Sequence, residues 1–291
     1  MISCDFETTT HGKWILAGEH AVLRGHPALV FPINEKKLTL YFHPSKSGLT
    51  ADYAGDAGSD MEQLFWNVLE HGIQIFGHPL DDVHGHFHLQ SNIPIGVGMG
   101  ASAALCVAIA RWFSSQHMLT TLEIEHFAIE LEHLFHGQSS GLDIAGVAAT
   151  TGIYFQKGIA LPIKQTWQPR WFLSTCGQVG MTSPCIKAVQ ALWQSNPTRA
   201  AAIDQQMHTS VLTARTALED ENMSQLAKAI NTAAECFQQW GLISTSLQHH
   251  MQTLRNAGAI AVKPTGSGGG GYVISLWTDT PCNTPIDFIL G

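Results

Sequence analysis

The sequence has few charged residues and no excess of basic ones. Asp, Glu, Lys and Arg make up 13% of its 291 residues, against about 25% in typical soluble domains. Fifteen basic and 23 acidic residues give a formal net charge of −8. Broad electrostatic binding to nucleic acid or to anionic lipid is therefore excluded, and any anion that the protein binds must be small and held locally.

Long hydrophobic runs are also absent. The longest purely apolar run extends from Ala103 to Ala110 and ends at Arg111, whereas about 20 apolar residues are needed to cross a bilayer. The N-terminal segment carries Asp5 and Glu7 where a secretory signal needs a basic start and an apolar stretch. These patterns predict a cytoplasmic protein with no membrane span.

The cysteines and histidines do not form a recognisable metal motif. The six cysteines include no C-x-x-C pair, so neither a zinc knuckle nor a redox dithiol is indicated. His84, His86 and His88 alternate and share one face of a predicted strand. No cysteine or carboxylate stands at ligand spacing beside them, and a solvated strand face is favoured over a zinc centre.

The pattern of apolar residues predicts an α+β protein of two lobes. Hydrophobic residues make up 45% of the chain, as in globular proteins, and the length suits two cores. The first half alternates β-patterned runs with apolar helical runs, which is typical of an α/β or α+β fold. The predicted strands cover residues 13–17, 28–33, 37–43, 86–90, 152–156, 159–163, 171–175, 260–263 and 272–277. Predicted helices cover residues 61–76, 105–113 and 120–136.

The second half has a different order of elements. One strand is followed by three or four helices and then by two strands, which predicts a split β-α-β, ferredoxin-like lobe. A polar segment containing Pro169 separates this half from the first. We therefore expect an N-terminal lobe over residues 1–165 and a C-terminal lobe over residues 166–291.

A glycine-rich turn, SNIPIGVGMGASAA (91–104), follows the strand predicted at residues 86–90. Its three alternating glycines remove side chains where a backbone could approach a phosphate, and small residues then start an apolar helix. Ser102 adds a hydroxyl at the helix start, which can ligate a magnesium ion that bridges phosphates. The structural alternative is a tight strand-to-helix turn with small residues for packing.

Two common nucleotide motifs do not fit this turn. Gly96, Gly98 and Ala101 match the G-x-G-x-x-A form of the dinucleotide fingerprint. That fingerprint needs an acidic residue at the end of a second strand about 20 residues on, and here the first acid is Glu123, inside a predicted helix. No G-x-x-x-x-G-K-[ST] motif occurs either. The turn is therefore interpreted as a phosphate loop of another type.

A second glycine cluster lies near the C-terminus, at Gly266 and residues 268–271. A flexible linker could have this composition, but predicted strands flank the cluster on both sides. A linker would separate domains and would not join two neighbouring strands of one sheet. Two glycine loops in one chain predict two walls around one anionic ligand.

Several charged residues carry little information individually. Asp143, in the segment HGQSSGLDIAGVA, is placed either as a helix cap or as a catalytic acid. Glu132 reads as a helix charge at the edge of an apolar stripe. Lys13, Glu19 and His20 flank the first predicted strand, and each alone would be an ordinary surface residue.

Three segments together resemble the GHMP kinase superfamily and, within it, the mevalonate kinases. GKWILAGEHAVLRGHPALVFPIN (12–34) is similar to the opening pattern of the family, PIGVGMGASAAL (94–105) to its phosphate loop, and KPTGSGGGG (263–271) to its C-terminal motif. The sequence G-E-H-A-V-L and the segment HGQSSGLD (136–143) are the features most like mevalonate kinases. One departure is Ala101, where the family usually has the first of two serines.

The resemblance implies a two-lobed fold with a ribosomal-protein-like N-terminal lobe and a ferredoxin-like C-terminal lobe. It implies ATP and Mg²⁺ as cofactors and a small-molecule acceptor, mevalonate. Asp143 would be the general base and Lys13 its cationic partner, Ser102 and Glu132 would hold the metal, and Lys13, Glu19, His20 and Asp143 would contact the acceptor. The residues implied to bind the ATP phosphates are Pro94, Gly96, Gly98, Gly100, Ala101, Ser102, Ala103, Gly266, Gly268 and Gly269.

Two alternatives to this function remain open from the sequence. Another GHMP kinase could act on phosphomevalonate, a sugar or an amino-acid alcohol such as homoserine, because fold alone does not fix the acceptor. A relative without catalytic activity could bind a nucleotide as a regulator, although Lys13, Glu132 and Asp143 are all present. Relatives are often dimers, and the low charged fraction is compatible with a homodimer.

Overall fold

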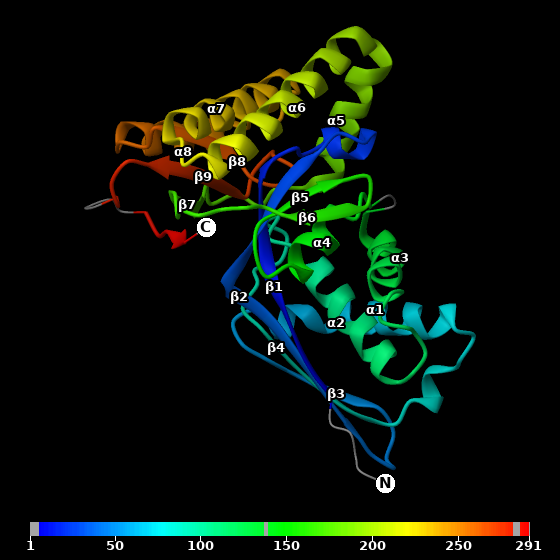
Figure 1. The fold of residues 1–291 in the computed structure, drawn as a ribbon. Coiled ribbons are helices and arrows are strands. Elements are labelled where there is room, and N and C mark those ends of the chain that lie inside the picture. The colour runs from blue at the N-terminus through cyan, green and yellow to red at the C-terminus, as the bar shows by residue number, and fades with distance from the viewer. Residues whose placement is uncertain (1–5, 137–138, 282–285, 291) are drawn as a thin grey trace. The chain divides into compact units, whose positions relative to one another are not determined.

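The computed structural model of the chain describes residues 6–136, 139–281 and 286–290 (Figure 1). Its contacts group into two compact units built from interleaved segments. Unit 1 comprises residues 1–13, 33–95 and 99–149. Unit 2 comprises residues 14–32, 96–98 and 150–291. The predicted lobe boundary between residues 165 and 166 stays a prediction.

Unit 1 combines strands with four α-helices. Within it, β2 pairs antiparallel with β4, and β3 pairs parallel with β4. β1 also pairs with β2, and both strands continue along the chain into unit 2. The strands are β1 (Phe6–Ala17), β2 (Ala28–Pro44), β3 (Thr50–Ala54) and β4 (Gly85–Ser91). The α-helices are α1 (Glu62–Ile75), α2 (Ala101–Ser115), α3 (Ile124–His136) and α4 (Leu142–Ala148), and two short 3-10 helices are η2 (Ser59–Met61) and η3 (Leu80–Asp82).

Unit 2 contains a hairpin, a helical layer and a second sheet. The β5–β6 hairpin pairs with the first residues of β2. The second sheet has the order β10-β7-β9-β8, with every neighbouring pair antiparallel. The strands are β5 (Ile153–Gln156), β6 (Ile159–Pro162), β7 (Arg170–Thr175), β8 (Ala261–Pro264), β9 (Tyr272–Trp277) and β10 (Ile289–Leu290). The helices are η1 (Ala21–Arg24), α5 (Thr182–Ser195), α6 (Pro197–Glu219), α7 (Met223–Gln239) and α8 (Thr245–Asn256).

Three helices of unit 2 begin where a polar side chain caps them. The side chains of Asn196, Asn222 and Ser244 each accept a hydrogen bond from the backbone N–H three residues later. Pro197, the first residue of α6, needs no hydrogen-bond partner for its nitrogen there. These caps satisfy donors that a helix start otherwise leaves without partners.

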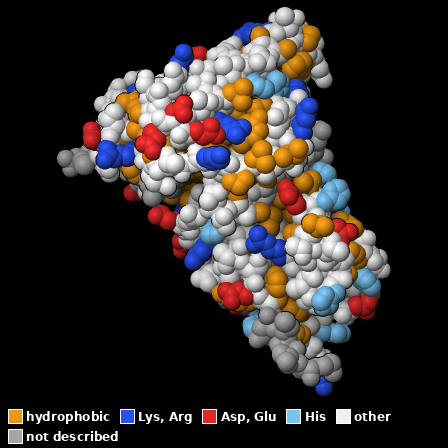
Figure 2. Space-filling model, viewed as in Figure 1, with side chains coloured by type: hydrophobic (Ala, Val, Ile, Leu, Met, Phe, Trp, Pro, Cys, Tyr) orange, Lys and Arg blue, Asp and Glu red, His pale blue; other side chains and the backbone are white. Residues whose placement is uncertain are grey.

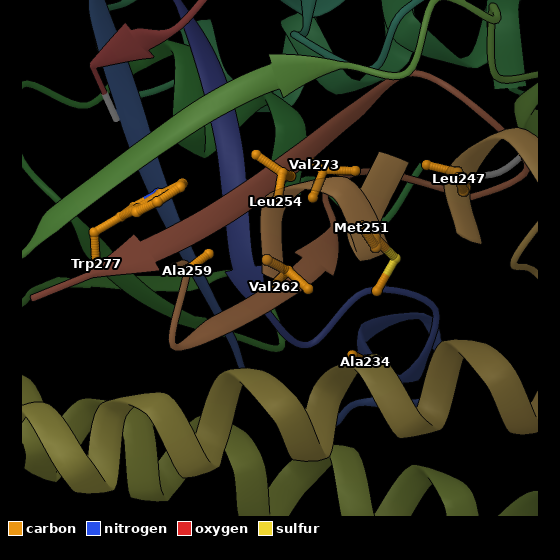
Figure 3. Close-up of a cluster of buried hydrophobic side chains, with 8 residues drawn as sticks. All are labelled: Ala234, Leu247, Met251, Leu254, Ala259, Val262, Val273 and Trp277. Carbon is orange, nitrogen blue, oxygen red and sulfur yellow. The ribbon is translucent and has the colours of Figure 1, made fainter. Parts of the chain in front are cut away.

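Apolar side chains fill the interior of each unit. In unit 1, α2 is apolar around most of its circumference, and Trp112 and Phe113 are almost fully buried. In unit 2, α8 packs on the second sheet (Figure 3). Leu254 of α8 and Val273 of β9 are both fully buried there. The eight residues of this cluster are Ala234, Leu247, Met251, Leu254, Ala259, Val262, Val273 and Trp277.

Most of the predicted elements are present, with two differences. The strands predicted at residues 28–33 and 37–43 are one strand, β2, because the polar residues 34–36 between them stay extended and form no turn. The helix predicted from residue 120 begins at Ile124. The Thr120 N–H and hydroxyl both donate to Glu123 Oε2 at 2.7 Å, so the predicted capping contact lies in the turn before the helix.

The second sheet confirms the split β-α-β arrangement. β7 and β8 lie on either side of β9, and the four helices α5–α8 connect β7 to β8 along the chain. No helix in the part of the chain that the structure describes is long and apolar enough to cross a membrane. On the described surface drawn in Figure 2, basic and acidic side chains are interspersed, without a broad basic patch.

Candidate active site

A lysine and an aspartate form an ion pair in unit 1. The Lys13 Nζ lies 2.6 Å from the Asp143 Oδ1, and the lysine side chain is 2% exposed whereas that of the aspartate is 33% exposed. The backbone N–H of Lys13 donates to the Met99 carbonyl at 2.9 Å. Asp143 is the second residue of α4, which begins after Gly141 in the left-handed conformation. The pair therefore presents a carboxylate to the surface while a buried ammonium stabilises its charge.

Glu132, on α3, is buried near this ion pair. Its side chain accepts a hydrogen bond at Oε2 from the Ser139 hydroxyl, and among the described residues its Oε1 has no hydrogen-bond partner. Burial, and secondarily the negative charge of Asp143, raises the pKa of Glu132 to about 7. A buried carboxylate oxygen without a partner is costly, and a bound cation would relieve that cost. Glu132 therefore fits a metal ligand.

The N-terminus of α2 lies next to the lysine. Gly100 precedes the helix with φ +82°, and no side chain caps the helix start. A Cβ at Gly100 would lie 2.9 Å from the Lys13 Cγ and from the Val147 Cγ1, so only glycine fits. The first backbone N–H groups of α2 thus remain available to an anion, and the hydroxyl of Ser102 stands in the first turn.

Unit 2 brings the two glycine segments together. A Cβ at Gly98 would lie 3.7 Å from the Gly266 Cα, and one at Gly271 would lie 3.0 Å from the Val97 carbonyl oxygen. Gly96, Gly98 and Gly266 all have positive φ, a conformation that glycine adopts without strain. The backbones of the two loops therefore approach each other where side chains would keep them apart. That they form two walls around one anionic ligand stays a prediction.

Glu19 and Lys263 form a buried ion pair in unit 2. The Lys263 Nζ lies 2.5 Å from the Glu19 Oε1 and 3.1 Å from the Ile15 carbonyl oxygen. Neither side chain is more than 2% exposed. The lysine ammonium also lies over the ring of Phe237, 5.2 Å from its centroid. The Lys263 ammonium is thus paired with a carboxylate inside the protein.

His20, the residue after Glu19, is also buried. A hydrogen bond from its ring holds the side chain in place. The Nε2 lies 2.8 Å from the Ser267 carbonyl oxygen, so Nε2 carries the proton and donates. Burial lowers the pKa of His20 to about 4, and the ring is neutral at pH 7. Its backbone has φ +59°, which is uncommon for a residue other than glycine.

Comparison with known proteins identifies the fold around these residues. Residues 63–152 match the family model for the GHMP kinases N terminal domain. The mevalonate kinase of Pyrococcus abyssi is 26% identical over 91% of this chain and 86% of its own length, and that of Thermococcus gammatolerans is 28% identical over the same shares. The chain belongs to the GHMP kinase superfamily. Within it, the chain is most like the mevalonate kinases.

A solved structure supports the fold of this GHMP kinase over nearly its whole length. The L. major mevalonate kinase in complex with R-mevalonate superposes with a TM-score of 0.80 at 23% identity. The match covers 96% of this chain and 89% of that protein. The two-lobed GHMP kinase fold expected from the sequence is therefore confirmed.

The structure of this GHMP kinase places the predicted site residues in two groups. Unit 1 brings Lys13, Asp143 and Glu132 together, with Ser102 in the first turn of α2. Unit 2 holds Glu19 and His20 against the second glycine loop. The remaining predicted residues lie along the two loops or at the start of α2, and they are Pro94, Gly96, Gly98, Gly100, Ala101, Ala103, Gly266, Gly268 and Gly269. Their roles stay predictions.

The backbone N–H of Gly269, one of the glycines predicted to bind phosphate, already has a hydrogen-bond partner in the protein. The N–H of Gly269 donates to the Leu242 carbonyl at 2.8 Å, so this amide is used within the protein. A Cβ at Gly269 would lie 3.0 Å from the Cys185 Sγ. At this position glycine provides space for the loop, and an amide for a phosphate must come from another residue.

Sequence reasoning did not single out Ser139 or Lys263. Ser139 lies in the segment that carries Asp143, but a serine among small polar residues gives no signal of its bond to Glu132. Lys263 is the first residue of the second glycine motif, where a lysine suggests a phosphate ligand. Its burial and its pairing with Glu19 depend on contacts across more than 240 residues of sequence, which local patterns do not contain.

Proposed function

We propose that this protein is a mevalonate kinase, which transfers the terminal phosphoryl group of ATP to the primary hydroxyl of mevalonate. The products would be ADP and 5-phosphomevalonate. The observation that carries the proposal is the ion pair between Lys13 and Asp143, at 2.6 Å in unit 1. Relatives named mevalonate kinase, which align with 91% of this chain, support the choice of acceptor.

Asp143 would accept the proton of the acceptor hydroxyl. Its side chain is one-third exposed, so a substrate oxygen can reach it while Lys13 stays buried behind it. The lysine would stabilise the developing alkoxide and the negative charge of the transferring group. Phosphoryl transfer requires mainly positioning and charge neutralisation, and this pair supplies both.

Glu132 and Ser102 would hold a magnesium ion. The buried Glu132 Oε1, without a partner among the described residues, is the protein oxygen that a cation fits, and a serine hydroxyl is a known type of Mg²⁺ ligand. When bound, the ion would neutralise charge on the phosphates of ATP. Ser139 would keep the Glu132 carboxylate in place through its hydrogen bond to Oε2.

The glycine loop and the start of α2 would bind the phosphates of ATP. The α2 helix begins without a capping side chain, and its first N–H groups and the positive end of its dipole favour an anion. Gly100 leaves room for the Lys13 side chain, which a Cβ would approach to 2.9 Å. The same glycine thus serves both the phosphate loop and the catalytic lysine.

An acceptor panel tests the proposal. Magnesium-dependent ADP release from ATP is measured with mevalonate, phosphomevalonate, galactose and homoserine offered separately, and the product is identified by mass and by ³¹P NMR. The proposal predicts turnover with mevalonate and a phosphate on its primary hydroxyl. Turnover with another acceptor alone would overturn the choice of substrate, and ATP binding without turnover on any acceptor would favour a non-catalytic relative.

A further inference from the structure

Lys263 occupies the position where a phosphate-binding lysine would be expected, at the start of the second glycine motif. Its side chain is fully buried. The ammonium is surrounded by Glu19 Oε1 at 2.5 Å and by the Ile15 carbonyl oxygen at 3.1 Å, and it lies over the Phe237 ring. Its charge and its hydrogen-bonding capacity are directed at the protein, which does not suit a ligand of phosphate.

The lysine belongs to a set of contacts that joins the two ends of the sequence within unit 2. Thr265, two residues further on, accepts a hydrogen bond at Oγ1 from the Ile15 N–H at 2.8 Å and donates from Oγ1 to the Ile15 carbonyl at 3.1 Å. The ring of His20 bonds to the Ser267 carbonyl at 2.8 Å. The segment 263–267 therefore fixes the segment 15–20 through the side chains of Lys263 and Thr265 and the backbone carbonyl of Ser267.

A buried ion pair is an expensive way to make such a connection. Removing two charges from water costs more than their attraction repays unless the geometry is good, and apolar residues often pack at least as stably. Buried pairs are more readily understood where they fix one arrangement of the groups around them. Here the groups nearby are the end of β1 and the residue after Glu19, which is His20 in a strained backbone conformation with φ +59°.

We propose that Lys263 is a positioning residue, which acts through Glu19 to hold His20 and the surrounding turn in the orientation that receives the acceptor substrate. This inference rests on the proposed function and on the expectation, implied by the sequence resemblance, that His20 contacts the acceptor of that reaction. It assigns Lys263 to the acceptor and not to the phosphates of ATP. It also assigns Glu19 to the lysine, since its carboxylate is 2% exposed and its Oε1 pairs with the Lys263 ammonium.

The test compares Lys263→Met, Glu19→Gln and the double variant with the parent enzyme. In each we measure kcat, the KM for mevalonate, the dissociation constant of a non-hydrolysable ATP analogue and the melting temperature. The matched control is Lys228→Met, which removes an exposed lysine of α7. Lys263→Met leaves a carboxylate buried without its cation, so it is expected to lower the melting temperature.

The double variant separates positioning from stability, because it removes both charges at once. We expect its melting temperature to return toward that of the parent, whereas kcat/KM for mevalonate stays about tenfold or more below the parent value and the affinity for the ATP analogue changes less than about threefold. Recovery of kcat/KM together with stability would overturn the positioning role. A change confined to the affinity for the ATP analogue would overturn the assignment to the acceptor.

The parent enzyme distinguishes failure of this inference from failure of the proposed function. If the parent does not phosphorylate mevalonate, the proposed function is refuted together with the inference that depends on it. If the parent turns over mevalonate and a folded Lys263→Met variant keeps the parent kcat and KM, the inference alone is refuted. If neither single variant folds, the double variant still decides the question.

Discussion

The Lys13 ammonium lies 2.6 Å from the Asp143 carboxylate, with the lysine almost fully buried and the aspartate partly open to the surface. This asymmetry gives the two groups different chemistry. The cation is held in a low-dielectric environment, where its effect on neighbouring oxygens is stronger than in water. The carboxylate can meet a substrate hydroxyl without moving its partner.

Loss of Lys13 should therefore lower the rate of the chemical step more than it lowers the affinity for ATP. Lys13→Met is expected to lower kcat by about 10²–10⁴-fold, since it removes a charge that stabilises the transition state, and to change the KM for ATP much less. Steady-state ADP release at saturating acceptor measures this. Lys37→Met, which removes an exposed lysine, is the control, and a Lys13→Met variant with near-parent kcat would contradict the assignment.

A side chain at Gly100 should impair the enzyme because it would collide with Lys13 and Val147, and this effect can be separated from backbone strain. Gly100 and Gly158 have φ of +82° and +79°, so Gly→Ala costs about 1–2 kcal/mol of conformational strain at either position. Only at Gly100 does the new Cβ approach neighbours, at 2.9 Å from Lys13 and Val147. Gly100→Ala should lower kcat/KM by about tenfold or more, because Lys13 must move.

The matched variant Gly158→Ala should lose stability but keep parent kinetics, because nothing lies within 4 Å of its Cβ. Melting temperatures and kcat/KM of the two variants are compared. Equal kinetic effects of the two substitutions would refute the link between Gly100 and the lysine.

Glu132 is expected to lower the stability of the metal-free protein. Its pKa is raised from 4.5 to about 7, so the folded state binds a proton more tightly than the unfolded chain does. The free energy of unfolding then falls as pH rises from about 4.5 to 7, and it stays low above that range. Glu132→Gln should raise the free energy of unfolding at pH 8 by about 3 kcal/mol, although we expect it to abolish turnover.

Urea unfolding in the presence of a chelator, at pH 8 and at pH 4.5, measures this effect. At pH 4.5 the parent and Glu132→Gln should be nearly equally stable, because the parent carboxyl is then protonated when folded. A Glu132→Gln variant that is less stable than the parent at pH 8 would show that the carboxylate is satisfied by the protein alone.

His20 should give a pH dependence of the opposite sign. Its pKa is lowered from 6.5 to about 4, so the unfolded chain takes up a proton more readily, and the free energy of unfolding decreases as pH falls from about 6.5 to 4. The difference in stability between the parent and His20→Gln should change by about 3 kcal/mol across this range. Gln is chosen because its side-chain amide can still donate to the Ser267 carbonyl. A difference that is constant with pH would contradict the buried, neutral ring.

Much of the fold follows from local patterns. The strands predicted at residues 152–156 and 159–163 are formed as β5 and β6, and they pair through a Lys157-Gly158 turn in which both residues adopt positive φ. The short strand β3 was not predicted, since Thr50–Ala54 is only partly buried and has no strong apolar alternation. β2 is longer than predicted because polar residues can continue a strand without forming a turn.

The candidate site was predictable only where a motif carries it. Lys13, Asp143 and Glu132 were predicted as site residues because whole segments resemble the family, since each residue alone looks like a surface charge. Lys263 and Ser139 bond to partners that only folding brings near them, namely Glu19 and Glu132. Composition and spacing do not encode such pairings, because the partners of a buried charge are fixed by tertiary packing.

The most direct test of the central claim is turnover of mevalonate by Asp143→Asn compared with Asp52→Asn. Asp52 is a half-exposed aspartate of unit 1 that bonds to His86 and His88, so it controls for loss of a surface carboxylate. If Asp143 is the general base, Asp143→Asn loses about 10²-fold or more in kcat with little change in ATP affinity, whereas Asp52→Asn keeps parent kcat. Parent-like turnover of mevalonate by a folded Asp143→Asn enzyme would contradict that role.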